Sequence, residues 1–272
     1  MKIVDGFMFY NELDFLFYRL SVLYDYVDYF VIVESQYTHS GKEKPLFYEE
    51  NKERFAQFQS KIIHSIHKNP LKESEIDCSK GEAWKNENNQ RDQLKDEFDA
   101  LSLAPEDIIL ISDLDEIPDI SLLQSIRSNE VVIDQIYGLR QDFYYYNLNT
   151  RFVDPWVSAK IMSYSIFKET TSTTTTCSNI RFNHVRSYPL IERGGWHLSY
   201  FGDKYFIQNK LTNFAHQEYN SEQYTNLDII QYRMFAQTDL FGRPCNVDKI
   251  AIKDNAYLPP RCHELLTKYI LY

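Results

Sequence analysis

The chain has 272 residues, of which 43% are hydrophobic, 25% charged and 15% aromatic, and this is enough to bury a large core in an α/β domain. The net charge is -10 at pH 7 and the lysines and arginines form no run, which excludes a surface that tracks nucleic-acid phosphates. The four cysteines form no C-x-x-C pair, which argues against a zinc knuckle or a dithiol redox site.

The first half of the chain alternates extended and helical patterns. The expected elements are, in chain order, a strand over 2–9, a helix from an N-cap at Asn11 to Leu23, a strand over 29–35, a helix over 49–58, a strand over 61–66, a helix over 83–101 and a strand over 107–112. Strands and helices that alternate in this way form crossover units. We therefore predict a mostly parallel sheet flanked by helices.

After Pro118 the alternation gives way to long aromatic runs. We expect a short helix over 121–126, strands within 135–149 and 156–167, a threonine-rich loop over 170–177, helices over 203–216 and 227–238, and a last helix after 259–260. The threonine-rich segment has no helical or apolar period, although its β-branched residues would also suit a hairpin. The sequence shows no internal repeat and no linker, so we expect one domain.

No apolar stretch approaches the roughly 20 residues that a membrane-spanning helix needs. The first residues also lack the basic, apolar and small-residue regions of a signal peptide. For the sequence as given we expect a soluble protein with no visible membrane anchor, and its location is either cytoplasmic or not fixed by the sequence.

Three carboxylates, Asp113, Asp115 and Glu116, follow the strand over 107–112. Side chains of like charge held this close repel one another unless a positive group lies between them. In parallel α/β sheets ligands bind beyond the carboxyl ends of the strands, where this motif is expected to lie. Oxygen ligands suit Mg²⁺ or Mn²⁺, and these ions also bind substrate phosphates. The motif therefore predicts a metal site, and a solvated acidic turn is the alternative.

Several blocks of the sequence, in one order, resemble glycosyltransferase family 17. They lie between about residues 2 and 220 and read FMFYNELDFLFYRLSVLYDYVDYFVIVES, SGKEKPLFYEENKERF, NENNQRDQL, DIILISDLDEIP, GGWHLSYFG and FAHQEYN. This is the family of the enzyme that adds the bisecting N-acetylglucosamine to N-glycans. Several blocks in one order are more specific evidence for a family than the D-x-D motif formed by Asp113 and Asp115 alone.

The resemblance implies a GT-A fold, with a nucleotide-sugar-binding half over 1–118 and an acceptor-side half, partly antiparallel and with the C-terminal helices, over 119–272. It implies an inverting transfer of N-acetylglucosamine or a related hexose from a UDP-sugar to a hydroxyl of an oligosaccharide or glycoprotein. It also implies a divalent cofactor, Mn²⁺ or Mg²⁺.

The resemblance also implies roles for residues of the D-x-D and GGWH motifs. Asp115 would bind the metal directly, and Asp113 would contact the ribose or the waters of the metal. His197 would complete the metal site, and the glycines before it would let the main chain approach the donor. A packed histidine beside Trp196 is the alternative for His197.

On the expected helix over 83–101, Glu87 and Arg91 share a face with apolar side chains such as Trp84. We therefore expect Arg91 to point inward and to orient the aspartates or bind the diphosphate. A surface ion pair between Glu87 and Arg91 is the alternative. Glu34, at the end of the strand over 29–35, is a candidate to bind uridine or ribose, or to cap a turn.

Inversion requires a base that removes the proton from the acceptor hydroxyl. The candidates are Glu218, Asp142 and, behind them, Asp203, each of which also suits a structural role. The aromatic run 143–146 would stack on an acceptor sugar, but alternate strand positions face opposite ways, so at most half of it can do so.

Two other classes of function remain at this point. A metal-dependent phosphohydrolase or nucleotidyltransferase would use the same carboxylates, but a phosphohydrolase normally needs a second metal cluster or a nucleophile motif, which the sequence lacks. A non-catalytic glycan-binding module would use the aromatic side chains and would have no need of a D-x-D pair.

Overall fold

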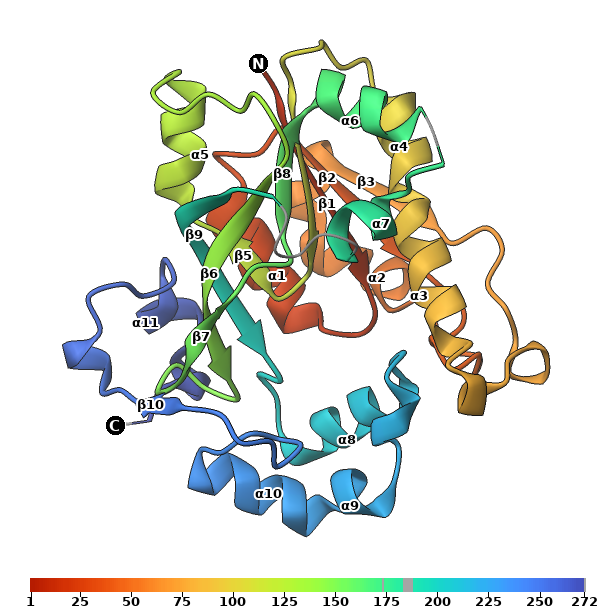
Figure 1. Cartoon of the computed structure of the whole chain (residues 1–272), viewed down its shortest axis with the longest axis vertical. Coiled ribbons are helices and arrows are strands. Elements are labelled where there is room, and N and C mark those ends of the chain that lie inside the picture. Colours follow the sequence, from red (N-terminus) through yellow and green to blue (C-terminus); the bar gives the residue numbers. More distant parts are fainter. Residues whose placement is uncertain (173, 183–187, 272) are drawn as a thin grey trace.

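The structure, a computed structural model, describes residues 1–172, 174–182 and 188–271. Its strands form one sheet in the order β10-β7-β6-β8-β4-β1-β2-β3, with β9 paired to both β5 and β6. Helices flank this sheet, and three further helices, α8 to α10, lie together beyond one of its ends (Figure 1). The α/β class expected from the alternating pattern is confirmed.

The strands are β1 (Ile3–Phe9), β2 (Tyr29–Glu34), β3 (Ile62–Ile66), β4 (Ile108–Asp113), β5 (Glu116–Pro118), β6 (Tyr137–Tyr145), β7 (Thr150–Trp156), β8 (Lys160–Ser163), β9 (Leu190–Ser199) and β10 (Val247–Lys249). The α-helices are α1 (Leu13–Leu23), α2 (Phe47–Glu50), α3 (Ala83–Asp92), α4 (Leu94–Ala100), α5 (Ile120–Arg127), α6 (Tyr164–Thr171), α7 (Cys177–Phe182), α8 (Lys204–Asn213), α9 (Glu222–Thr225), α10 (Leu227–Ala236) and α11 (Cys262–Leu265).

The strands of the first half, in the order β4-β1-β2-β3, are all parallel. Strand β4 is apolar on both faces because helices cover both. Ile108 and Leu110 belong to a core shared with α1 and α5, whereas Ile109 and Ile111 belong to a core shared with α4, α6 and α7. Because the strands are parallel, their carboxyl ends meet at one edge of the sheet, as the sequence predicts for the D-x-D motif.

The second half continues the same sheet with a different pairing. Strand β8 is antiparallel to β4, and β6 is antiparallel to both β7 and β8. Strand β9 runs parallel to β6 and antiparallel to the short β5, which brings His197 opposite Glu116. A third core, which includes Ile207 of α8 and Ile230 of α10, packs against Tyr146 after β6.

The expected elements differ from the structure in a few places. Helix α1 begins at Leu13, and its N-cap is Glu12 without a side-chain cap bond, not Asn11. The helix expected over 49–58 is α2 followed by a 3₁₀ segment, Lys52–Lys61. The helix expected over 83–101 is divided between α3 and α4 at Gln93.

The strand expected over 156–167 was also too long. Strand β8 ends at Ser163, whose hydroxyl accepts a hydrogen bond from the Ile166 amide and so caps α6. In the threonine-rich segment, Thr171 ends α6 and Cys177 begins α7, while residue 173 lies outside the described residues. Within the described residues, none of the helices is long and apolar enough to cross a membrane.

Candidate active site

A cavity of about 400 Å³ lies at the carboxyl ends of β1, β2 and β4. Both halves of the chain line it. The wall from the first half includes Phe9, Glu12, Thr38, Glu87, Arg91, Asp113 and Asp115, and the wall from the second half includes Phe143, Trp156, Arg181, His197, Tyr200, Lys210 and Phe241.

A buried arginine holds the turn that carries the two aspartates. The Nη1 group of Arg19 donates hydrogen bonds to the carbonyl oxygens of Asp113, Leu114 and Glu116 at 2.9, 3.0 and 2.7 Å. Its Nε and Nη2 groups donate to the Asp5 carboxylate at 2.8 and 2.6 Å, and both side chains are fully buried. Arg19 therefore fixes the main chain of the turn and leaves the side chains of Asp113 and Asp115 free to face the cavity.

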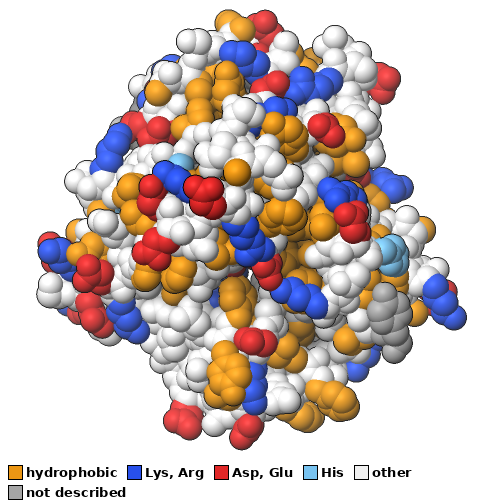
Figure 2. Space-filling model, turned by 180° about the vertical axis from the view of Figure 1, so that it is seen from behind, with side chains coloured by type: hydrophobic (Ala, Val, Ile, Leu, Met, Phe, Trp, Pro, Cys, Tyr) orange, Lys and Arg blue, Asp and Glu red, His pale blue; other side chains and the backbone are white. Residues whose placement is uncertain are grey.

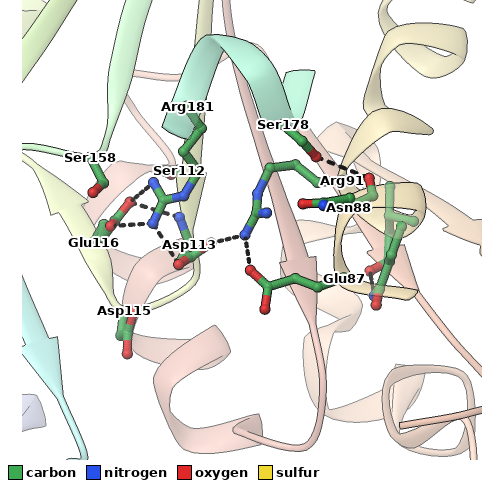
Figure 3. A network of polar contacts seen from close by, with 12 residues as sticks. Glu87, Asn88, Arg91, Ser112, Asp113, Asp115, Glu116, Ser158, Ser178 and Arg181 are labelled. Carbon is green, nitrogen blue, oxygen red and sulfur yellow. Dashed lines mark hydrogen bonds and ion pairs between the residues drawn. The ribbon is translucent and has the colours of Figure 1, made fainter. Parts of the chain in front are cut away.

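Two arginines neutralise the Asp113 carboxylate (Figure 3). Arg91 Nη2 lies 3.0 Å from Oδ1 and Arg181 Nη2 lies 2.6 Å from Oδ2. Arg181 also donates to both oxygens of the buried Glu116, at 2.6 and 2.7 Å. Burial opposes ionisation of Asp113, but the two guanidinium groups outweigh it and lower its pKa. Asp113 is thus an ionised acid whose two oxygens are both bound by protein cations.

Asp115 lies apart from the two arginines (Figure 3). Its oxygens face Lys210 Nζ at 3.2 Å and His197 Nε2 at 3.4 Å. Burial opposes ionisation of this carboxyl, but Lys210 and His197 outweigh it and hold its pKa well below the usual range. Lys210 in turn has a raised pKa despite its burial, mainly because of Asp115 and Glu12. The cavity therefore contains an ionised carboxylate whose contacts are an ammonium group and an imidazole.

Several buried nitrogens at the cavity have no hydrogen-bond partner among the described residues. They are Nε and Nη1 of Arg91, Nε of Arg181 and Nδ1 of His197. A buried donor left unpaired costs free energy, and guanidinium groups are well suited to oxyanions. All three residues line the cavity, so its wall contains two guanidinium groups of the kind that binds oxyanions.

Of the residues that the sequence suggested for nucleotide binding, Glu87 and Arg91 line the cavity and Glu34 does not. Glu87 lines the cavity and accepts a hydrogen bond from Arg91 Nη2 at 2.9 Å, so Arg91 points inward as its helical position predicts. Glu34 is fully buried and is absent from the described lining of the cavity, although its Oε1 atom lies 3.9 Å from Nζ of the lining residue Lys44. It accepts a hydrogen bond from the Tyr48 amide and lies 3.0 Å from His64 Nε2, so it anchors α2 to β3.

The three base candidates, Glu218, Asp142 and Asp203, are absent from the described lining of the cavity. Glu218 is paired at 2.6 Å with Nδ1 of His216, which itself lines the cavity, and Asp142 is paired with Arg151 at 3.4 Å. Asp203 caps α8. In the described contacts none of these three carboxylates touches Asp113 or Asp115.

Gly194 and Gly195, which precede His197 in β9, allow close packing between strands of the sheet. Gly195 has φ +125°, and a Cβ atom there would lie 2.0 Å from the Ile117 carbonyl oxygen. A Cβ on Gly194 would lie 2.7 Å from the Cβ of Leu139 on β6. The close approach that these glycines permit is therefore between β9 and its neighbouring strands, and the sequence-based expectation of an approach to a donor is replaced by this packing role.

Aromatic side chains form the wall of the cavity around His197. Phe143 stacks on the imidazole with ring centroids 4.8 Å apart and an interplanar angle of 5°, and the Trp156 ring lies 4.5 Å away. Phe143 and Tyr145 line the cavity, whereas Tyr144 between them is buried in the main core and bonds Asn255. The alternation expected for the run 143–146 is therefore present in β6.

Sequence reasoning missed Glu12, Arg181 and Lys210. Glu12 was read as part of a helix start, and its neighbour Asn11 has the stronger capping chemistry. Arg181 and Lys210 lie 68 and 95 residues from the aspartates that they contact, and no local pattern distinguishes them from other surface cations.

On the face turned away from Figure 1, lysines and arginines lie among acidic and hydrophobic side chains (Figure 2).

The fold and the site together define an α/β protein with a charged ligand cavity at the ends of parallel strands. The family model described as glycosyltransferase family 17 matches residues 1–245, and the chain belongs to this family, which makes it a glycosyltransferase.

A search of curated proteins finds no match. The chain is similar to a solved structure, the 4-diphosphocytidyl-2C-methyl-D-erythritol synthase of Anaerococcus prevotii DSM 20548, at 9% identity and a TM-score of 0.37. This match covers 76% of the present chain and 93% of the synthase.

Proposed function

We propose that the protein is a metal-dependent, inverting glycosyltransferase of the GT-A type. It transfers N-acetylglucosamine or a related hexose from a UDP-sugar to a hydroxyl of an oligosaccharide or glycoprotein. Residues 1–118 bind the nucleotide and residues 119–272 form the acceptor side of one catalytic domain. The observation that carries the proposal is that one cavity combines the ionised Asp115, the imidazole of His197 and the unpaired guanidinium nitrogens of Arg91.

The residues present fit a divalent cation in part. Asp115 and His197 offer an oxygen and a nitrogen ligand on the same cavity, whereas both oxygens of Asp113 are taken by arginines. Within 1–172, 174–182 and 188–271, no group of three or more His, Cys, Asp or Glu side chains is placed to hold a metal. The site therefore suits an ion such as Mn²⁺, which takes its remaining ligands from substrate phosphates and water and, when bound, stabilises the charge on the leaving diphosphate.

The arginines act on the same leaving group. Nε and Nη1 of Arg91 are buried without a hydrogen-bond partner among the described residues, while Glu87 and Asp113 hold its Nη2 group. In this proposal the guanidinium of Arg91, in the wall of the cavity, binds a diphosphate oxygen and so favours the negative charge that develops on it. In this proposal Asp113 orients Arg91 and Arg181, and Asp115 with His197 supplies the protein ligands of the metal.

Calorimetry of UDP binding tests the proposal. With MnCl₂ present we expect wild-type protein to bind UDP, and with EDTA we expect no binding. Asp115→Asn should abolish the Mn²⁺-dependent binding, whereas Asp248→Asn, which removes a half-exposed carboxylate on β10, should leave it unchanged. Equal UDP affinity with MnCl₂ and with EDTA would overturn metal dependence and assign the neutralisation of the diphosphate to Lys210, Arg91 and Arg181.

The donor is identified by a thermal-shift panel of UDP-, GDP- and CMP-sugars with MnCl₂, because a ligand that binds only the native state raises the melting temperature. We expect UDP-N-acetylglucosamine or another UDP-hexose to give the largest shift. A larger shift with a GDP- or CMP-sugar would contradict the proposed donor class.

A further inference from the structure

A second, larger hollow of about 1100 Å³ lies beside the cavity. Its walls are the connection between β1 and α1, the first turn of α8, the exposed side of α10 and the last residues of the chain. We call it the α8–α10 groove. Nothing described above assigns it a role.

The α8–α10 groove and the cavity share one lining side chain. Glu12 lines both of them. Lys210 Nζ lies 3.8 Å from Glu12 Oε1 and 3.2 Å from Asp115 Oδ2, so the two carboxylates lie on either side of one ammonium group. A molecule bound in the groove would therefore lie against Glu12, whose carboxylate shares the Lys210 ammonium group with Asp115.

The lining of the groove combines exposed aromatic rings with polar side chains. Phe235 on α10 is 88% exposed and Tyr205 on α8 is 60% exposed, while Gln231 supplies an exposed amide group. A sugar ring presents an apolar C–H face and several hydroxyls, and this pairing of aromatic surface with an amide matches both. Large exposed aromatic side chains that line one hollow also mark a binding surface more strongly than scattered ones do.

We propose that the α8–α10 groove binds the acceptor oligosaccharide and that Glu12 is the base of the transfer reaction. This inference rests on the proposed function. In the reaction the Glu12 carboxylate takes the proton of the acceptor hydroxyl, and the hydroxyl oxygen forms a bond to the anomeric carbon of the donor sugar. The bond from that carbon to the diphosphate breaks, and UDP leaves with the electron pair. Glu12 is the cavity carboxylate that the groove also reaches, and arginine holds neither of its oxygens in the described structure.

A glycan array with labelled protein, UDP and MnCl₂ tests the groove. We expect Phe235→Ala and Tyr205→Ala to weaken the glycan signal about tenfold, because each removes an aromatic surface that the sugar would cover. The matched control is Tyr232→Ala, since Tyr232 is 69% exposed on α10 but lies outside the groove lining. All three variants should keep the wild-type affinity for UDP in calorimetry.

The outcomes separate this inference from the proposed function. If wild-type protein fails to bind UDP, the proposed function fails first. If UDP binds but no arrayed oligosaccharide does, or if Phe235→Ala and Tyr205→Ala bind glycans as the wild type does, the groove assignment is overturned. Size-exclusion chromatography of the same variants adds a check, because a shift from dimer to monomer would instead identify the groove as a contact between copies of the chain.

Glu12→Gln tests the base. Using the donor from the thermal-shift panel and the best glycan from the array, we expect transfer to fall by about 10²- to 10⁴-fold while UDP and glycan binding stay at wild-type level. Transfer at the wild-type rate would overturn the assignment. A loss of UDP or glycan affinity that accounts for the loss of transfer would also overturn it, because Glu12 would then position ligands and not move a proton.

Discussion

Lys210 Nζ lies 3.2 Å from a carboxylate oxygen of Asp115, whereas Arg91 and Arg181 hold the neighbouring Asp113. Lys210 comes from α8 and Asp115 from the turn after β4, so this contact closes the cavity between the two halves of the chain. The ammonium group occupies part of the space around the carboxylate that we propose as a metal ligand. Lys210 and a divalent cation would therefore compete for Asp115.

This competition predicts the effect of Lys210→Met. Removing the ammonium group leaves Asp115 with one neutralising partner fewer, so Mn²⁺ should bind about tenfold more tightly in the absence of UDP. Calorimetry or the loss of the free Mn²⁺ signal in electron paramagnetic resonance would measure this. Lys204→Met, at the start of the same helix, is the control and should not alter Mn²⁺ affinity. Weaker Mn²⁺ binding in Lys210→Met would contradict competition at Asp115.

Arg91 is expected to bind the phosphates of UDP and not its uridine part. Arg91→Met should weaken UDP binding roughly ten- to a hundredfold, because a hydrogen bond to a charged group is lost. The affinity for uridine, which has no phosphate, should be unchanged. Arg140→Met removes an exposed arginine paired with Glu192 and is the control. An equal loss of affinity for UDP and uridine would place Arg91 near the nucleoside or in a purely structural role.

Arg19 is expected to contribute strongly to the free energy of unfolding, because it anchors the turn that carries the two aspartates. Arg19→Met leaves the fully buried Asp5 carboxylate without its ion-pair partner, so the free energy of unfolding should fall by about 3–5 kcal/mol in urea titrations. The second substitution, Asp5→Leu in the same chain, should restore part of that loss because it removes the unpaired charge. Arg127→Met breaks a partly exposed pair with Asp28 and should cost less than about 1 kcal/mol. Equal losses for Arg19→Met and Arg127→Met would be inconsistent with a buried anchor.

His67 predicts a pH dependence of stability. Burial, and to a lesser degree the nearby His39, lowers the pKa of His67 to about 4 in the folded state, whereas the pKa of an unfolded histidine is about 6.5. Between these values the unfolded chain binds a proton that the native state excludes. The native state therefore loses stability as the pH falls from about 6.5 to about 4, by on the order of 3 kcal/mol.

Urea unfolding at several pH values between 4 and 7 measures this loss. His67→Gln does not titrate, so its stability should fall less steeply with acid than that of the wild type. The exposed His263 provides the control, and His263→Gln should follow the wild-type slope. Parallel curves for His67→Gln and the wild type would show that His67 does not carry the effect.

Much of the site's framework could be predicted from local sequence. The apolar run of β4 followed by acidic residues placed Asp113 and Asp115 at the carboxyl end of a parallel strand, and the structure has them there. Helical periodicity also predicted that Arg91 points inward, because it shares a helix face with apolar side chains. Such features follow from patterns within one element, which the chain carries in its order of residues.

Glu34 shows where local reasoning leaves the choice open. Its position at the end of β2 suits a nucleotide contact or a cap, and in the structure its carboxylate accepts a hydrogen bond from the Tyr48 amide in the first turn of α2 and lies beside His64. Tyr48 belongs to α2 and His64 to β3, and both reach Glu34 only because these elements pack against the end of β2.

The sequence alone determined the α/β alternation, the place of the D-x-D turn and the family of the chain. Only the tertiary structure decided that Arg181 and Arg91 hold Asp113, that Lys210 and His197 face Asp115, and that Glu12 lies between the cavity and the groove. The physical reason is that secondary structure follows the periodicity of neighbouring residues, whereas charges from distant parts of the chain find their partners only when packing and burial force them together.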